Sequence, residues 1–87
     1  MNEKQVTELI LQSLEHEMGG TMVYETALKC VMNDDLREEW QKYLYETNNH
    51  VRILTEACNE LGLDPEMPTP GRTIVKKIGL SLVAAME

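Results

Sequence analysis

The chain has 87 residues and a formal net charge of −7 at pH 7, with 15 acidic residues against eight lysines and arginines. Such a composition argues against nucleic acid and anionic membranes as partners, because phosphate groups are bound by clustered Lys and Arg. The only basic cluster is Arg72, Lys76 and Lys77. No apolar run approaches the ~20 residues that a membrane-spanning helix needs. The two cysteines form no CxxC motif, so a reduced cytoplasmic location is expected.

The first long segment with helical periodicity covers about residues 3–32. Asn2 can cap its start, with Gln5 reaching back to complete a capping box. No proline interrupts the segment. The Asn-Asp-Asp sequence at 33–35 then breaks the pattern, so we expect the first helix to end before it.

A second helix is expected over about residues 36–61. Asp35 and Glu38 have the spacing of a capping box at its start, and Gly62 is placed to end it in a left-handed conformation. Because the turn between the two helices is short, they must run antiparallel. Residues 1–62 therefore predict an all-α antiparallel helical hairpin.

The rest of the chain predicts a linker and a short third helix. Residues 63–72 contain all three prolines, which indicates a stiff connection. Residues 73–87 predict a short third helix, and Thr69-Pro70 could cap and open this segment. We expect this last segment to be part of a longer chain, or to need a partner that supplies the missing helices. Its apolar face contains Ile74, Ile78, Leu82 and Ala85.

Both long helices carry a stripe that repeats every seven residues over about four heptads. In an antiparallel hairpin with this turn, residues whose numbers add up to about 67 lie level with one another. Large residues then face small ones across the contact, as interdigitating layers require. The stripes are Val6, Ile10, Ser13, Glu17, Gly20, Tyr24, Ala27 and Val31 on the first helix, and Leu36, Trp40, Tyr43, Thr47, His50, Leu54, Ala57 and Leu61 on the second.

Both stripes become polar at the same height. Glu17 is level with His50, and Gly20 is level with Thr47. A buried carboxylate or imidazole costs several kcal/mol unless it is paired or bound to something. Such breaks in an apolar pattern concentrate at functional sites. A hairpin also needs two further helices to cover its stripe, so we expect a four-helix bundle, formed by dimerisation or with sequence that is missing here.

Glu17 and Tyr24 on the first helix, followed by Glu46 and His50 on the second, resemble the ferritin-like superfamily. Members hold two metal ions, usually iron, between one Glu from each of two helices and a Glu-x-x-His pair from each of the other two. The resemblance covers about residues 2–62. It implies iron or another divalent metal as cofactor, and O₂- or peroxide-dependent iron oxidation or iron handling. Two copies of the hairpin would supply four carboxylates and two imidazoles.

In this chain Glu46 and His50 are four residues apart instead of three, and Thr47 holds the position three before His50. Residues four apart still share a helix face. The resemblance therefore implies Glu17, Glu46 and His50 as metal ligands, with Tyr24 and Thr47 next to them. Carboxylate oxygens combined with imidazole suit Fe(II), Mn(II) or Zn(II).

The alternative is a protein without metal or catalysis. Glu17 and His50 could hydrogen-bond each other as a buried polar layer in a dimerising hairpin. Buried polar residues can specify the register of packed helices at a cost in stability. In either case a homodimer is the expected assembly, and the sequence leaves open whether the protein is an enzyme.

Three further expectations concern residues outside the site. Glu15 and His16 are predicted on a solvated face of the first helix. Gly19 with Gly20 is predicted to permit close helix approach, at about 1 kcal/mol per glycine relative to alanine. Cys30 and Cys58 lie at different heights in the hairpin, so no disulfide is expected between them.

Overall fold

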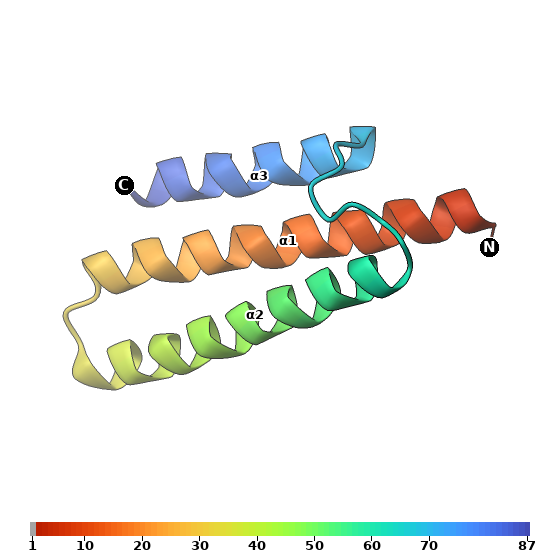
Figure 1. The fold of residues 1–87 in the computed structure, drawn as a ribbon. Helices are drawn as coiled ribbons and strands as arrows, with labels where there is room; N and C mark the ends of the chain where they lie inside the picture. The colour runs from red at the N-terminus through yellow and green to blue at the C-terminus, as the bar shows by residue number, and fades with distance from the viewer. Residues whose placement is uncertain (1) are drawn as a thin grey trace.

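The computed structural model describes residues 2–87, which form three α-helices joined by two short connections (Figure 1). Helix α1 spans Glu3–Cys30, α2 spans Asp34–Glu60 and α3 spans Pro70–Met86. α1 and α2 form the expected antiparallel hairpin, and α3 returns along the other side of α1, parallel to it. Among the described residues α2 and α3 each contact α1 but not each other. The all-α prediction is confirmed, with α1 as the middle helix of a single layer.

The start of α1 is as predicted, whereas the turn after it lies two residues earlier, at 31–33. Asn2 accepts a hydrogen bond from the Gln5 amide at 2.8 Å, and the Gln5 side chain accepts one from the Asn2 amide at 3.0 Å. α1 ends at Cys30, two residues before the predicted boundary. The predicted cap at Asp35 is wrong, because the Asn33 side chain accepts from the Leu36 amide at 3.1 Å and starts α2 at Asp34.

The end of α2 has the geometry expected around Gly62. This glycine has a φ of 73°, in the left-handed region that favours glycine. Its amide donates to the Asn59 carbonyl at 3.2 Å, and the Leu63 amide donates to the Cys58 carbonyl at 2.8 Å. These two bonds define a Schellman ending. Leu63 then packs on the small core, so this ending directs the connection across α1.

Helix α3 begins at the predicted Thr69-Pro70 pair, three residues before the expected helix boundary at residue 73. Thr69 caps it by accepting from the Arg72 amide at 3.0 Å, and Pro70 is its first residue. The connection from α2 therefore covers only residues 61–69. The apolar face of α3 does not pack on α1: Ile74, Ile78 and Leu82 are 61, 65 and 51% exposed.

The contact between α1 and α2 confirms the predicted register. The rings of Tyr24 and Tyr43 lie with their centroids 5.8 Å apart. One turn away, a Cβ on Gly20 would lie 3.3 Å from Cγ2 of Thr47. Both pairs were predicted to be level, so the seven-residue repeat and the short turn are enough to align the hairpin.

The double glycine permits close packing on both sides of α1. Gly20 faces α2 at Thr47, while Gly19 faces α3 at Gly79. A Cβ on Gly79 would lie 3.6 Å from the Gly19 Cα atom. The backbones of α1 and α3 therefore meet almost directly, which confirms the expectation of close approach.

The described layer encloses little apolar volume. Its fully buried large side chains are Leu11, Leu14 and Cys58. The accessible surface is 6238 Å², whereas a compact monomer of 10.0 kDa exposes about 5,200 Å². The radius of gyration is 14.5 Å, against about 12 Å for a compact chain of this length. One copy thus exposes about 1,000 Å² more than a self-contained domain of its size.

The Gly19–Gly79 contact predicts opposite effects of a small and a large side chain. Gly79→Ala introduces a Cβ at an ordinary contact distance and should raise the free energy of unfolding by up to about 1 kcal/mol through helix propensity. Gly79→Leu should lower it by about 1–3 kcal/mol through overpacking. Urea unfolding followed by circular dichroism measures both variants. Equal stability of the two variants would show that α3 does not rest on α1 at this point.

Candidate functional site

Glu17 of α1 and His50 of α2 approach each other across the hairpin. The His50 Nδ1 atom lies 3.4 Å from the Glu17 Oε2 atom. This confirms that the two residues are level. The pair is not buried in one chain, however, since the Glu17 side chain is 27% exposed and that of His50 is 56% exposed. The predicted burial therefore depends on something that covers the pair.

Glu46 does not join this pair within one chain. It is exposed on α2, about one turn before His50. Among residues 2–87, no group of three or more His, Cys, Asp or Glu side chains is close enough to hold a metal ion. One copy thus brings together two of the three predicted ligands. A complete metal site would need ligands beyond those that the described residues bring together.

Thr47 and Tyr24 belong to the helix contact next to the pair. The Thr47 hydroxyl is buried and donates to the Tyr43 carbonyl at 2.8 Å. The Tyr43 hydroxyl donates to Glu39 at 2.6 Å, and this bond, together with the Glu39 charge, raises the pKa of Tyr43. The rings of Tyr24 and Tyr43 contact each other at a tilt of 44°. Among the described residues, this contact brings no third metal ligand to the Glu17–His50 pair.

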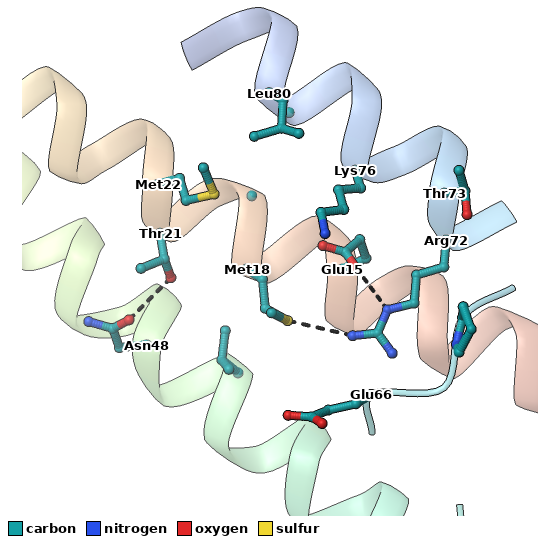
Figure 2. Close-up of a pocket in the computed structure, with 14 residues that line it drawn as sticks. Glu15, Met18, Thr21, Met22, Asn48, Glu66, Arg72, Thr73, Lys76 and Leu80 are labelled. Carbon is teal, nitrogen blue, oxygen red and sulfur yellow. Dashed lines mark hydrogen bonds and ion pairs between the residues drawn. The ribbon is translucent and has the colours of Figure 1, made fainter. Parts of the chain in front are cut away.

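A groove of about 610 Å³ lies between α2 and α3, with α1 as its floor (Figure 2). It is open to solvent, because α2 and α3 do not meet. Polar side chains gather towards the end where the connection 61–69 crosses α1. The apolar part of the lining comes from Met18, Met22, Val51, Pro68 and Leu80.

The opposite side of the layer carries a second set of exposed apolar side chains. Successive helical residues are 100° apart, so side chains two positions apart point in nearly opposite directions. Ile78 and Leu82 each lie two positions from Leu80, which lines the groove. Ile53 lies two positions from Val51, another groove residue, and is 48% exposed. We call this side the far face.

The Glu17–His50 pair opens onto the far face. Asn48 lines the groove, and its side-chain oxygen accepts from the Thr21 hydroxyl at 3.1 Å. His50 and Glu46 are each two positions from Asn48 and therefore point away from the groove. The far face is defined by Glu17, Glu46, His50, Ile53, Ile74, Ile78 and Leu82.

A buried ion pair closes one end of the groove. The Arg72 Nε atom of α3 donates to Glu15 Oε1 of α1 at 2.7 Å, and the two side chains are only 8 and 11% exposed. The same guanidinium donates to the carbonyls of Pro65 and Met67 and lies 3.7 Å from the Met18 sulfur (Figure 2). Arg72 thus joins α1, the connection and α3. The prediction that Glu15 faces solvent is wrong, because α3 covers that side of α1.

Glu8 lies about two turns before Glu15 on α1, where it binds the first turn of α3. Its Oε1 atom accepts from the Thr69 hydroxyl at 3.0 Å, the Gly71 amide at 2.9 Å and the Gln12 side chain at 3.1 Å. The bond from Thr69 is the main reason that the pKa of Glu8 lies below 4.5; Gln12, Gly71 and the charge of Lys4 act in the same direction, while desolvation opposes them. A carboxylate at a helix N-terminus also complements the helix dipole.

The sequence contains a signal for this second contact. Glu8, Gln12, Glu15 and Gly19 follow the same alternating spacing of four and three as the stripe that faces α2. Because three of these four residues are polar, the pattern predicts a face exposed to solvent. The start of α3 supplies hydrogen-bond donors that match these polar side chains, so the face packs against α3 instead.

Breaking the buried ion pair should destabilise the protein strongly. Arg72→Met leaves the Glu15 carboxylate buried without its partner, which costs about 3–5 kcal/mol of unfolding free energy. The double variant Glu15→Leu/Arg72→Met should recover much of this loss, because an apolar pair needs no compensation. Chemical denaturation measures both, with the exposed Lys77→Met as control. If the double variant loses as much as the single one, the carboxylate is not the cause.

The Glu8 contacts predict a dependence of stability on pH. Because the pKa of Glu8 is lower in the folded chain than its usual 4.5, its stabilisation is present above that value and disappears as the pH falls through the folded pKa. Glu8→Gln should therefore flatten the decline in unfolding free energy between about pH 5 and pH 3. Denaturation at several pH values tests this, with Glu25→Gln as an exposed control on the same helix. An unchanged decline in the Glu8→Gln variant would refute it.

No family model matches this chain, and comparison with curated proteins and with solved structures finds no significant similarity. Within the described residues, no helix combines the length and apolarity needed to cross a membrane.

Proposed function

We propose that this chain is a ferritin-like helical protein that self-associates through its far face and binds a divalent metal, iron in the first instance, at the centre of the resulting bundle. The observation that carries the proposal is the position of the Glu17–His50 pair. It lies at ion-pair distance on a face whose apolar side chains remain exposed in one copy.

The exposed area of one copy supports self-association. Its excess of about 1,000 Å² over a compact monomer is similar to the ~800 Å² that each partner buries in a standard protein interface. The far face offers Ile53, Ile74, Ile78 and Leu82, each about half exposed or more. Burial of these side chains in a dimer is the natural source of the missing apolar stabilisation.

The chemistry of the pair supports metal binding once that face is covered. Two copies would bring four carboxylates and two imidazoles from Glu17, Glu46 and His50 to one interface. Carboxylate oxygen and imidazole nitrogen suit Fe(II), Mn(II) or Zn(II). Burial would remove the water that now solvates the half-exposed pair, and a bound cation would offset that cost. By the family resemblance, a bound iron pair would supply oxidation chemistry with O₂ or peroxide.

A second function has its own support. Glu17 and His50 already lie 3.4 Å apart, and among the described residues no third ligand gathers around them. The pair could then serve as a polar layer that fixes the register of a dimer without metal. In that case the protein is a non-catalytic assembly module.

Metal content separates the two functions. Protein loaded with Fe(II) under anaerobic conditions and then desalted should retain about one iron per chain, as a two-metal bundle of two chains requires. Glu17→Ala and His50→Ala should each remove most of it, while Glu25→Ala, an exposed carboxylate elsewhere on α1, should not. Elemental analysis together with light scattering gives the metal content per dimer.

Three other outcomes would decide between metal binding and the polar layer, or show that the ligands are other residues. A folded dimer that retains no iron contradicts metal binding and favours the polar layer. A Glu17→Leu/His50→Leu variant that stays dimeric and loses only metal contradicts the polar layer. Unchanged iron in Glu17→Ala would show that the ligands lie elsewhere.

A further inference from the structure

The groove between α2 and α3 has charged side chains at one end and apolar side chains along the rest (Figure 2). We propose that it binds an α-amino acid with a large apolar side chain, in the free zwitterionic form. The groove and the far face lie on opposite sides of the layer. Binding in the groove therefore needs neither self-association nor metal.

The groove has the size and lining of a site for one small molecule. Its volume of about 610 Å³ lies within the ~300–1,000 Å³ of small-molecule pockets. Thr73 and Leu80, which both line it, are seven residues apart on α3, and this spacing corresponds to a length of about 10 Å. The apolar lining includes Met18 and Met22, whose flexible thioether side chains adapt to different shapes. This length and lining suit a single apolar side chain.

The guanidinium of Arg72, whose side chain is only 8% exposed, turns one donor towards the groove. Its Nε and Nη1 atoms donate to oxygen atoms of Glu15, Pro65 and Met67. Among the described residues, the partner of its Nη2 atom is the Met18 sulfur at 3.7 Å (Figure 2). A thioether is a weak acceptor, whereas a carboxylate forms short, strong hydrogen bonds with a guanidinium. A ligand carboxylate that displaced the sulfur would therefore be a better partner for Nη2.

The charges at this end of the groove leave one cation and one anion free. Glu15 and Arg72 neutralise each other. Lys76, one turn after Arg72, and Glu66, between the two residues whose carbonyls accept from Arg72, also line the groove. Both are exposed, and neither forms an ion pair in the described part of the chain. A head group with a carboxylate and an ammonium complements both charges, whereas a simple carboxylate is repelled by Glu66 and a simple amine by Lys76.

The positions of these groups determine how the ligand lies. Its carboxylate accepts from Arg72 Nη2, in place of the thioether, on the side of the Lys76 ammonium. Its own ammonium lies on the side of Glu66. The apolar side chain then extends away from the charged end, along α1 and α3, towards Met22 and Leu80.

Three ligands with the same carbon chain test the head group: octanoate, octylamine and α-aminooctanoate. The α-amino acid should bind most tightly, because it alone complements both free charges. A titration followed through the backbone amide shifts in the NMR spectrum measures the three affinities. The shifts should concentrate at residues that line the groove, such as Gly19 and Thr73. Binding of octanoate or octylamine that is as tight as that of α-aminooctanoate would overturn the inference.

Charge-removing variants assign each half of the head group. Lys76→Met and Glu66→Gln should each weaken binding of α-aminooctanoate about two- to fivefold, as the loss of one exposed charge contact predicts. Glu66→Gln should not weaken binding of octanoate, and Lys76→Met should not weaken binding of octylamine. The control is Lys77→Met, which removes an exposed charge of α3 outside the groove lining. All three positions are exposed, so these variants should keep the fold.

Three results would contradict binding of a zwitterion in the groove. The first is a Glu66→Gln variant that binds α-aminooctanoate as tightly as the unchanged protein. The second is a Lys77→Met variant that loses as much affinity as Lys76→Met, because this would indicate general charge attraction. The third is a titration without amide shifts at the groove residues.

Discussion

The structure depends on one constraint: α1 must provide a packing surface on two opposite sides. Three helices in a single layer share no common interior, so each neighbour is held by its own side of α1. The consecutive glycines Gly19 and Gly20 let both neighbours approach at the same height. The two contacts use different chemistry. The side that faces α2 combines aliphatic and aromatic side chains, whereas the side that faces α3 is largely polar and is fixed by Glu8 and Glu15.

The half of the fold held by apolar contacts was predictable, and the polar half was not. A seven-residue repeat fixes which side of each helix is buried, and a short turn fixes the direction, so the register that joins Tyr24 to Tyr43 followed from the sequence alone. The docking of α3 did not follow, because Glu8 and Glu15 carry the composition of a solvated surface. Their role appears only when Arg72 and the Thr69 cap are brought beside them by the connection after Gly62.

In the candidate site, likewise, the alignment of the residues was predictable and their burial was not. The level positions of Glu17 and His50 followed from the register, and the structure places the two side chains at 3.4 Å. Whether they are buried could not be predicted from one chain, because that depends on what covers the far face. The placement of Glu46 follows from its spacing. Four residues before His50, it lies on the same far face about one turn away along α2, and among the described residues no third ligand joins the pair.

The polar contacts at the start of α3 limit how many axial positions the helix can adopt on α1. A helix that rests on another through glycine meets a smooth surface and gains little from any one axial position, so packing alone would leave several positions of similar free energy. Arg72 removes this ambiguity, because its directional bonds to Glu15, Pro65 and Met67 are satisfied in a single position. An ion pair at one end of the helix thus selects the axial position of every side chain along it. Specificity, rather than stability, is then what this costly buried pair contributes.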